Sequence, residues 1–172
     1  MYLQRAGDPL FDFAASSPLK AFTVGDQWYA FLGRTLFRLP VAAELAPVLL
    51  TDSETGRALA LSSVTHLRDP FPFASDANLA SDGRTRLLLF ARNVDWLRVN
   101  PNAPITVQAE DASHRIFNLT VEHAAVNPGL NWLTEIVVRL PDELSNGGEL
   151  KITVNAAGFV SNRTSVMIVR AP

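Results

Sequence analysis

The chain of 172 residues contains no cysteine, which excludes disulfides, thiolate nucleophiles, zinc–thiolate sites and iron–sulfur clusters. Lysine is rare, and a net charge of −2 gives no electrostatic footprint for nucleic acid or an anionic membrane. No apolar run is long enough to span a bilayer. Residues 1–18 lack the basic and apolar regions of a signal peptide, so we expect a cytoplasmic protein or a mature piece of a longer one.

What the sequence does contain is the alternation typical of β-strands. Apolar and polar residues alternate over 105–110, 117–123, 136–140, 150–155 and 166–168. No helical stretch long enough for a crossover connection separates these segments, which argues against a parallel sheet. The pattern predicts an all-β protein, an antiparallel immunoglobulin-like sandwich of about seven to eight strands.

The part of the chain before the sandwich has a different pattern. We expect two domains, an N-terminal segment over 1–46 and the sandwich over 47–172. Residues 1–23 show no sustained period and contain prolines, which indicates an extended arm. Two apolar segments, 28–31 and 35–39, flank a short connection that contains glycine, which predicts a β-hairpin.

Within the sandwich, three finer expectations follow from short-range patterns. Residues 64–67 are predicted to form a strand. Trp132 has the same parity as Ile136 and Val138 and is therefore expected in the core. His123 has the parity of the apolar residues of its strand, so we expect a core or edge histidine rather than a metal ligand.

The C-terminal part of the chain resembles the immunoglobulin-like domains called IPT/TIG. The resemblance covers the chain from Val137 onward and includes a strand that ends in Leu-Pro, a connection that ends in glycine, an alternating strand, and a glycine before Ser-Asn at the last strand. The matching residues are Leu140-Pro141, Gly147-Gly148, Leu150 to Val154, Gly158 and Ser161-Asn162.

A second resemblance covers about residues 47–169. Segments such as SSVTHLRDPFPF and WLTEIVVRLPDEL are similar to uncharacterised C-terminal modules of large secreted acidobacterial proteins. The two resemblances together imply an extracellular or cell-surface location and a role as a scaffold or adhesion-like module. They imply no catalytic activity.

The residues themselves supply no catalytic constellation. Ser113 and His114 lie beside Asp111, but adjacent turn residues do not create the geometry of a nucleophile and its base, and no Gly-x-Ser-x-Gly elbow is present. We expect no catalytic residue and no cofactor. Three aspartates are weak candidates for an irregular Ca²⁺ site, and capping of polar loops is the favoured interpretation. These weak calcium candidates are Asp69, Asp76 and Asp82.

Aromatic residues are the remaining candidates for binding. A ring face offers flat, amphipathic contact area, and the candidates are Trp28, Tyr29, Phe31 and Trp96. Our first hypothesis is a non-enzymatic structural or protein-interaction module that binds a protein partner or self-associates through the N-terminal segment. The segment packing on its own domain is an equal alternative. Our second hypothesis is a carbohydrate-binding accessory module that uses Trp96 and is stabilised by Ca²⁺.

Overall fold

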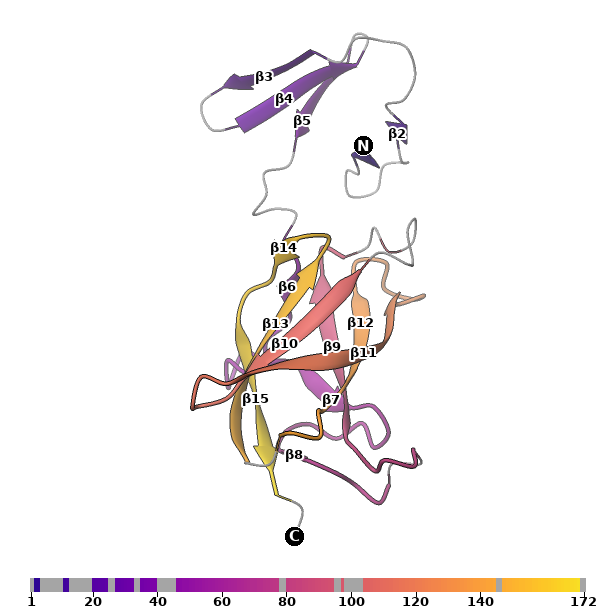
Figure 1. Cartoon of the computed structure of the whole chain (residues 1–172). Helices are drawn as coiled ribbons and strands as arrows, with labels where there is room; N and C mark the ends of the chain where they lie inside the picture. Colours follow the sequence, from indigo (N-terminus) through magenta and orange to yellow (C-terminus); the bar gives the residue numbers. More distant parts are fainter. Residues whose placement is uncertain are drawn as a thin grey trace. The chain divides into compact units, whose positions relative to one another are not determined.

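The computed structural model shows a protein built from β-strands (Figure 1). Every regular element in the described part of the chain is a strand, which confirms the predicted all-β class. The chain divides into two compact units, Met1–Leu45 and Ala46–Pro172. The structure describes residues 2–3, 11–12, 20–24, 27–32, 35–39, 46–77, 80–94, 97, 104–144 and 147–170.

The N-terminal unit contains two small antiparallel sheets. In the first, β1 (Tyr2–Leu3) pairs with β2 (Phe11–Asp12). The second has the order β3 (Lys20–Val24), β4 (Gln27–Leu32) and β5 (Thr35–Leu39). The hairpin expected around residue 33 is therefore present. Residues 20–23, the end of the expected extended arm, instead belong to β3, because so short a segment does not reveal its alternation by itself.

The second unit contains ten strands of one curled sheet (Figure 1). Its strands are β6 (Val48–Leu49), β7 (Ala60–Ser62), β8 (Phe71–Pro72), β9 (Arg86–Arg92), β10 (Ile105–Glu110), β11 (Ile116–Val126), β12 (Thr134–Arg139), β13 (Gly148–Ala156), β14 (Phe159–Val160) and β15 (Thr164–Val169). The hydrogen-bonded order is β6-β9-β12-β11-β10-β13-β15-β8, with β7 beside β9 and β14 beside β13. The pairing of β15 with β8 is parallel, and the other pairs in this unit are antiparallel.

One long strand, β11, connects the two halves of this sheet. Its first residues pair with β10, from Leu119 opposite Val107 to Ile116 opposite Glu110. Its later residues pair with β12 up to Val126. Figure 1 shows β11 running from the neighbourhood of β10 toward β12. Because the sheet curls, the inward faces of both halves contribute to one core.

The core has the period of two that the sequence predicts. Burial alternates residue by residue along β9, β12, β13 and β15, as expected when one face of each strand is covered. The largest fully buried side chains include residues from both halves of the sheet. Among them are Leu87, Leu89, Ile136, Leu150, Ile152 and Ile168.

The predicted strand over 64–67 is wrong. These residues form a turn and a connection, and Val64 and Leu67 remain 45% and 68% exposed. The Ser62 backbone explains the turn, since its carbonyl accepts a 2.9 Å hydrogen bond from the amide of His66. The amide of Thr65 also bonds the Ser62 hydroxyl, a local bond that competes with strand pairing.

One edge of the curled sheet is closed by a side chain. The backbone amide of Leu49 in β6 donates to Oδ1 of Asn162 at 2.7 Å, and Nδ2 of Asn162 donates to the Leu49 carbonyl at 3.1 Å. The amide of Asn162 thus takes the place of a neighbouring strand. Because Asn162 precedes β15, it ties the two ends of the sheet order together.

At the opposite end of the sheet, the short strand β8 pairs with Ile168 and Val169 of β15, and side-chain and loop contacts occupy backbone groups of the preceding residues of β15. The amide of Met167 donates to the Asp69 carboxylate at 3.3 Å, and Arg57 holds the same carboxylate oxygen at 3.1 Å. The carbonyl of Ser165 accepts a 2.8 Å bond from the amide of Ala58. Occupied edges protect a sheet from pairing with another chain.

We predict that Asn162→Ala lowers the free energy of unfolding by about 1–3 kcal/mol, because two backbone groups of the buried Leu49 lose their partners. Urea unfolding followed by circular dichroism measures the change. Asn118→Ala is the matched control, since Asn118 is exposed and its side chain accepts one bond from Gln108. We call the two hydrogen bonds between Asn162 and the backbone of Leu49 the clamp at Asn162. Equal unfolding midpoints for the two variants would show that this clamp does not stabilise the fold.

Candidate functional site

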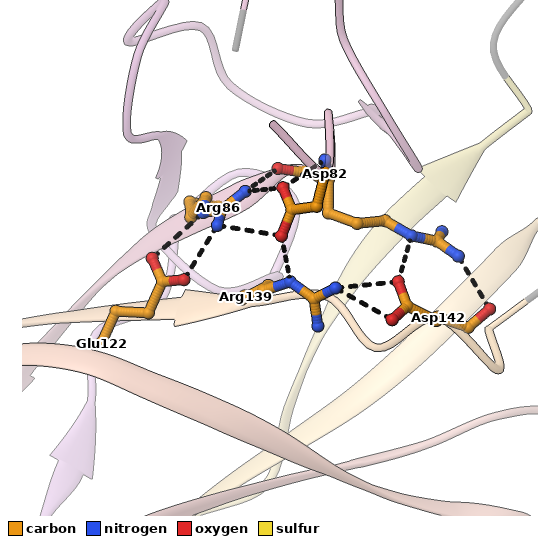
Figure 2. A network of polar contacts seen from close by, with 6 residues as sticks. Asp82, Arg86, Glu122, Arg139 and Asp142 are labelled. Atoms are coloured by element: carbon orange, nitrogen blue, oxygen red, sulfur yellow. Dashed lines mark hydrogen bonds and ion pairs between the residues drawn. The ribbon is translucent and has the colours of Figure 1, made fainter. Parts of the chain in front are cut away.

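A network of arginines and carboxylates covers part of the outer surface of β9, β11 and β12 (Figure 2). Arg139 donates to Asp82 at 2.6 Å and to both oxygens of Asp142 at 2.8 and 2.9 Å. Arg86 also binds Asp82. Three positive and three negative side chains take part, which makes the network neutral as a whole. Its members are Asp82, Arg84, Arg86, Glu122, Arg139 and Asp142.

A β-bulge in β11 brings Glu122 into this network. Val121 lies opposite Val138 and His123 opposite Val137, so Glu122 is the extra residue. Its two carboxylate oxygens each accept a 3.0 Å bond from the guanidinium of Arg86. A bulge re-aims the side chains of its strand.

The bulge also overturns the expectation for His123. The shift of register leaves His123 exposed, whereas Ala124 and Val126 pack against the core. The predicted core or edge histidine assumed that the alternation continued without interruption from Phe117. One inserted residue moves every later side chain of a strand to the opposite face.

The network favours the charged forms of four of its groups, Asp82, Arg86, Arg139 and Asp142. Hydrogen bonds from Arg86, and then from Arg139, lower the pKa of Asp82 far below its ordinary value. Arg139 and Arg84 likewise lower the pKa of Asp142. Asp82 and Glu122 raise the pKa of Arg86. A general acid or base needs a pKa near the working pH, so this arrangement is suited to fastening strands together and not to proton transfer.

The structure does not bring the three calcium candidates together. Asp69 binds Arg57 and the amide of Met167, and Asp82 binds two arginines. Asp76 is exposed in a turn. Among the described residues no group of three or more acidic, histidine or cysteine side chains is placed to hold a metal ion.

The structure describes the side chain of one of the four aromatic candidates for binding. Trp96 lies outside the described residues. Trp28 and Phe31 lie in β4, and the structure describes their backbone but not their side chains. Tyr29, also in β4, is half-buried.

Trp132, expected in the core, is instead 51% exposed. The parity argument failed because β12 begins only at Thr134, which places Trp132 in the preceding loop. Sequence reasoning had one available signal, the Asn-Pro-Gly turn over 127–129, but it did not show where the turn ends.

This loop, residues 127–133 and hereafter the Trp132 loop, is held by its own hydrogen bonds. Oδ1 of Asn127 accepts from the amides of Gly129 at 2.8 Å and Leu130 at 2.9 Å, and Nδ2 donates to Glu135 at 2.6 Å. The Asn127 amide bonds the carbonyl of Leu133, whose side chain is buried. The loop therefore presents an ordered tip.

Four described side chains of the N-terminal unit lie on one face of its three-stranded sheet, and three of them are exposed. Tyr29 lies opposite Arg38 in the register of β4 and β5, and opposite Phe22 of β3. Residues two apart share a face, which adds Val24 and Leu36. We call Val24, Tyr29, Leu36 and Arg38 the Val24 face. Val24 and Leu36 are 61% and 49% exposed.

Comparison with known protein families, with curated proteins and with solved structures gives no match. In the part of the chain that the structure describes, no helix has the length and apolar character needed to cross a membrane.

We predict that the stabilising effect of Asp82 depends on pH. In the folded protein the pKa of the Asp82 carboxyl is lowered from its ordinary value of 3.8. Its ion pairs therefore stabilise the fold fully at pH values above 3.8, and the stabilisation is lost as the pH falls toward the lowered pKa. The difference in urea midpoint between the natural chain and Asp82→Asn is therefore greatest near neutral pH and shrinks in acid. Asp76→Asn, at an exposed turn, is the control. A difference independent of pH would contradict this role.

Proposed function

We propose that this chain is a non-enzymatic structural module that binds other proteins. The second unit serves as an immunoglobulin-like scaffold, and the Val24 face of the first unit serves as the binding surface. The observation that carries the proposal is the exposure of two apolar side chains, Val24 and Leu36, and of Arg38 on one face of a sheet in which the described residues form three strands. In line with the resemblance to secreted modules, we place this function at the cell surface or outside the cell.

The strand order supports the immunoglobulin-like assignment. Such domains combine one sheet of strands A, B, E and D with a second sheet of C, F and G. The order β6-β9-β12-β11 fits the first sheet, and β10-β13-β15 fits the second. The departure is β11, which runs on from one sheet into the other as a single strand.

The contrast between the two units supports the location of the binding surface. In the second unit, Asn162 and Asp69 occupy backbone groups at the edges of the curled sheet. Among the described residues of the first unit, β3 and β5 each pair with one strand, β4. An edge with a single neighbour accepts an added strand, and an exposed apolar face gains free energy by being covered.

The charge network supports a function without proton transfer. Each of its carboxylates accepts hydrogen bonds from guanidinium groups, and the pKa values of Asp82 and Asp142 are lowered. Arg84 lies in the connection before β9, Arg86 in β9 and Arg139 in β12, so the network joins elements that are distant in sequence. Ion pairs of this kind hold strands together.

We predict that the full chain self-associates and that Val24→Ser combined with Leu36→Ser lowers the association constant at least about tenfold, because two exposed apolar side chains are lost from the contact. Sedimentation velocity over a range of concentrations measures the change. The combination of Val64→Ser with Leu67→Ser is the matched control, since these side chains are also exposed and apolar but lie in the other unit. A full chain that stays monomeric at every concentration would overturn self-association through the Val24 face.

A further inference from the structure

We propose that a hollow on the outer face of β10 and β13 binds an acidic sugar, a uronate. The inference goes beyond the proposed function and does not depend on it, because the hollow lies in the second unit and involves neither the Val24 face nor the Trp132 loop. The hollow has a volume of about 160 Å³. The side chains that line it include Gln108, Glu110, Ile116, Lys151, Thr153 and Arg163.

The register of three strands creates this hollow. Ile116, Glu110 and Lys151 lie side by side across β11, β10 and β13. In the neighbouring row of the same face, Gln108 lies opposite Thr153. The alternate residues of β10 and β13 are buried, so both rows face outward. Thr153 is short and its neighbours are long, which leaves space above its hydroxyl.

The lining of the hollow carries one positive charge in excess. It holds two cations, Lys151 and Arg163, and one carboxylate, Glu110. Arg163 donates to one oxygen of Glu110, and Nδ1 of His114 lies 2.7 Å from the other. Lys151 has no ion pair or hydrogen bond with any residue that the structure describes. Its ammonium is therefore available to a carboxylate of a ligand, as a charge-assisted donor.

Two further groups select a ligand that has hydroxyls. Nε2 of Gln108 donates to Asn118 at 3.0 Å, which leaves Oε1 of Gln108 as an acceptor. The hydroxyl of Thr153 can donate or accept, and within the described part of the chain neither it nor this Oε1 is bonded. A carboxylate alone has no proton to donate to Gln108, whereas a sugar hydroxyl has one. The aliphatic side chain of Ile116, 64% exposed, borders the hollow and offers contact to the C–H groups of a sugar ring.

The size of the hollow limits the ligand and its affinity. Pockets for drug-sized ligands have volumes of roughly 300–1,000 Å³, so about 160 Å³ accommodates a single small unit. Ion pairs at a solvent-exposed surface contribute little free energy. We therefore expect a dissociation constant on the order of millimolar.

A second hollow on the other side of Glu110 and Lys151 is unsuited to the same ligand. Its volume is about 240 Å³, and its lining includes Glu110, Asp111, His114, Glu149 and Lys151. Three carboxylates against one ammonium repel an anion. The uronate should therefore contact Thr153 and not Glu149, which gives the experiment a spatial readout.

We predict that sodium glucuronate, added to the full chain at constant pH and ionic strength, shifts the backbone amide signals of residues 108–110 and 151–153 in NMR spectra. Two probes separate the parts of the ligand. Glucose has the hydroxyls without the carboxylate, and acetate has the carboxylate without the hydroxyls. Each should bind at least about fivefold more weakly than glucuronate, because each lacks one set of hydrogen bonds.

We predict that Lys151→Gln weakens glucuronate binding about tenfold, because the charged donor is lost. Thr153→Val, which removes the hydroxyl from an outward-facing position, should weaken the binding of glucuronate and of glucose about threefold. Arg92→Gln is the matched control, since Arg92 is exposed in β9 and its loss changes the net charge by the same amount. This control should leave glucuronate binding unchanged.

Several results would overturn the inference. The hollow binds no uronate if glucuronate shifts no amide signal at its highest soluble concentration. Equal binding of acetate and glucuronate would mean that a carboxylate is recognised and a sugar is not. Shifts confined to residues 127–133 would assign the sugar to the Trp132 loop instead. Unchanged binding in Lys151→Gln would show that the ammonium is not a donor to the ligand. The proposed function of the Val24 face survives each of these results, because its test is association and not sugar binding.

Discussion

The hydrogen bonds between Asn162 and the backbone of Leu49 are the contact on which the shape of the second unit depends. A curled sheet that stops short of closure leaves two rows of backbone groups without partners. One asparagine amide supplies both a donor and an acceptor, so it satisfies a backbone amide and a carbonyl at once. With Asp69 bound to the amide of Met167 at the other edge, the sheet stays open while these backbone groups are not available for pairing with another chain.

The alternation of apolar and polar residues was sufficient to predict the all-β class and the central strands. It works for β9, β12, β13 and β15 because each of these strands has one face on the core throughout its length. It fails where a strand changes register or ends early. Nothing in the residues around Glu122 indicates a bulge, since the bulge is set by pairing with β12. Trp132 was predicted in the core because it has the same parity as the buried residues of β12. Parity does not show where a strand begins, and Trp132 precedes the first residue of β12.

The candidate sites were harder to predict for a related reason. A sequence shows where the carboxylates are, but not which cations face them across the fold. Asp82 was considered as a calcium ligand from its position in a polar loop, yet Arg139, which is 57 residues away, binds it. The same holds for exposure. Val24 and Leu36 have apolar side chains that composition alone would place inside, and only the register of three short strands shows that they share a face.

The clamp at Asn162 also has a consequence for the order in which the fold is completed. The strands β10, β11 and β12 are consecutive and joined by short connections, so their contacts are local and form quickly. The clamp instead joins residues separated by 113 positions, and the bond from Met167 to Asp69 joins residues separated by 98. During synthesis the chain emerges from its N-terminus. The amide and carbonyl of Leu49 therefore lack the Asn162 side chain as a partner, and are exposed to pairing with a neighbouring chain, until nearly the whole sheet has been synthesised.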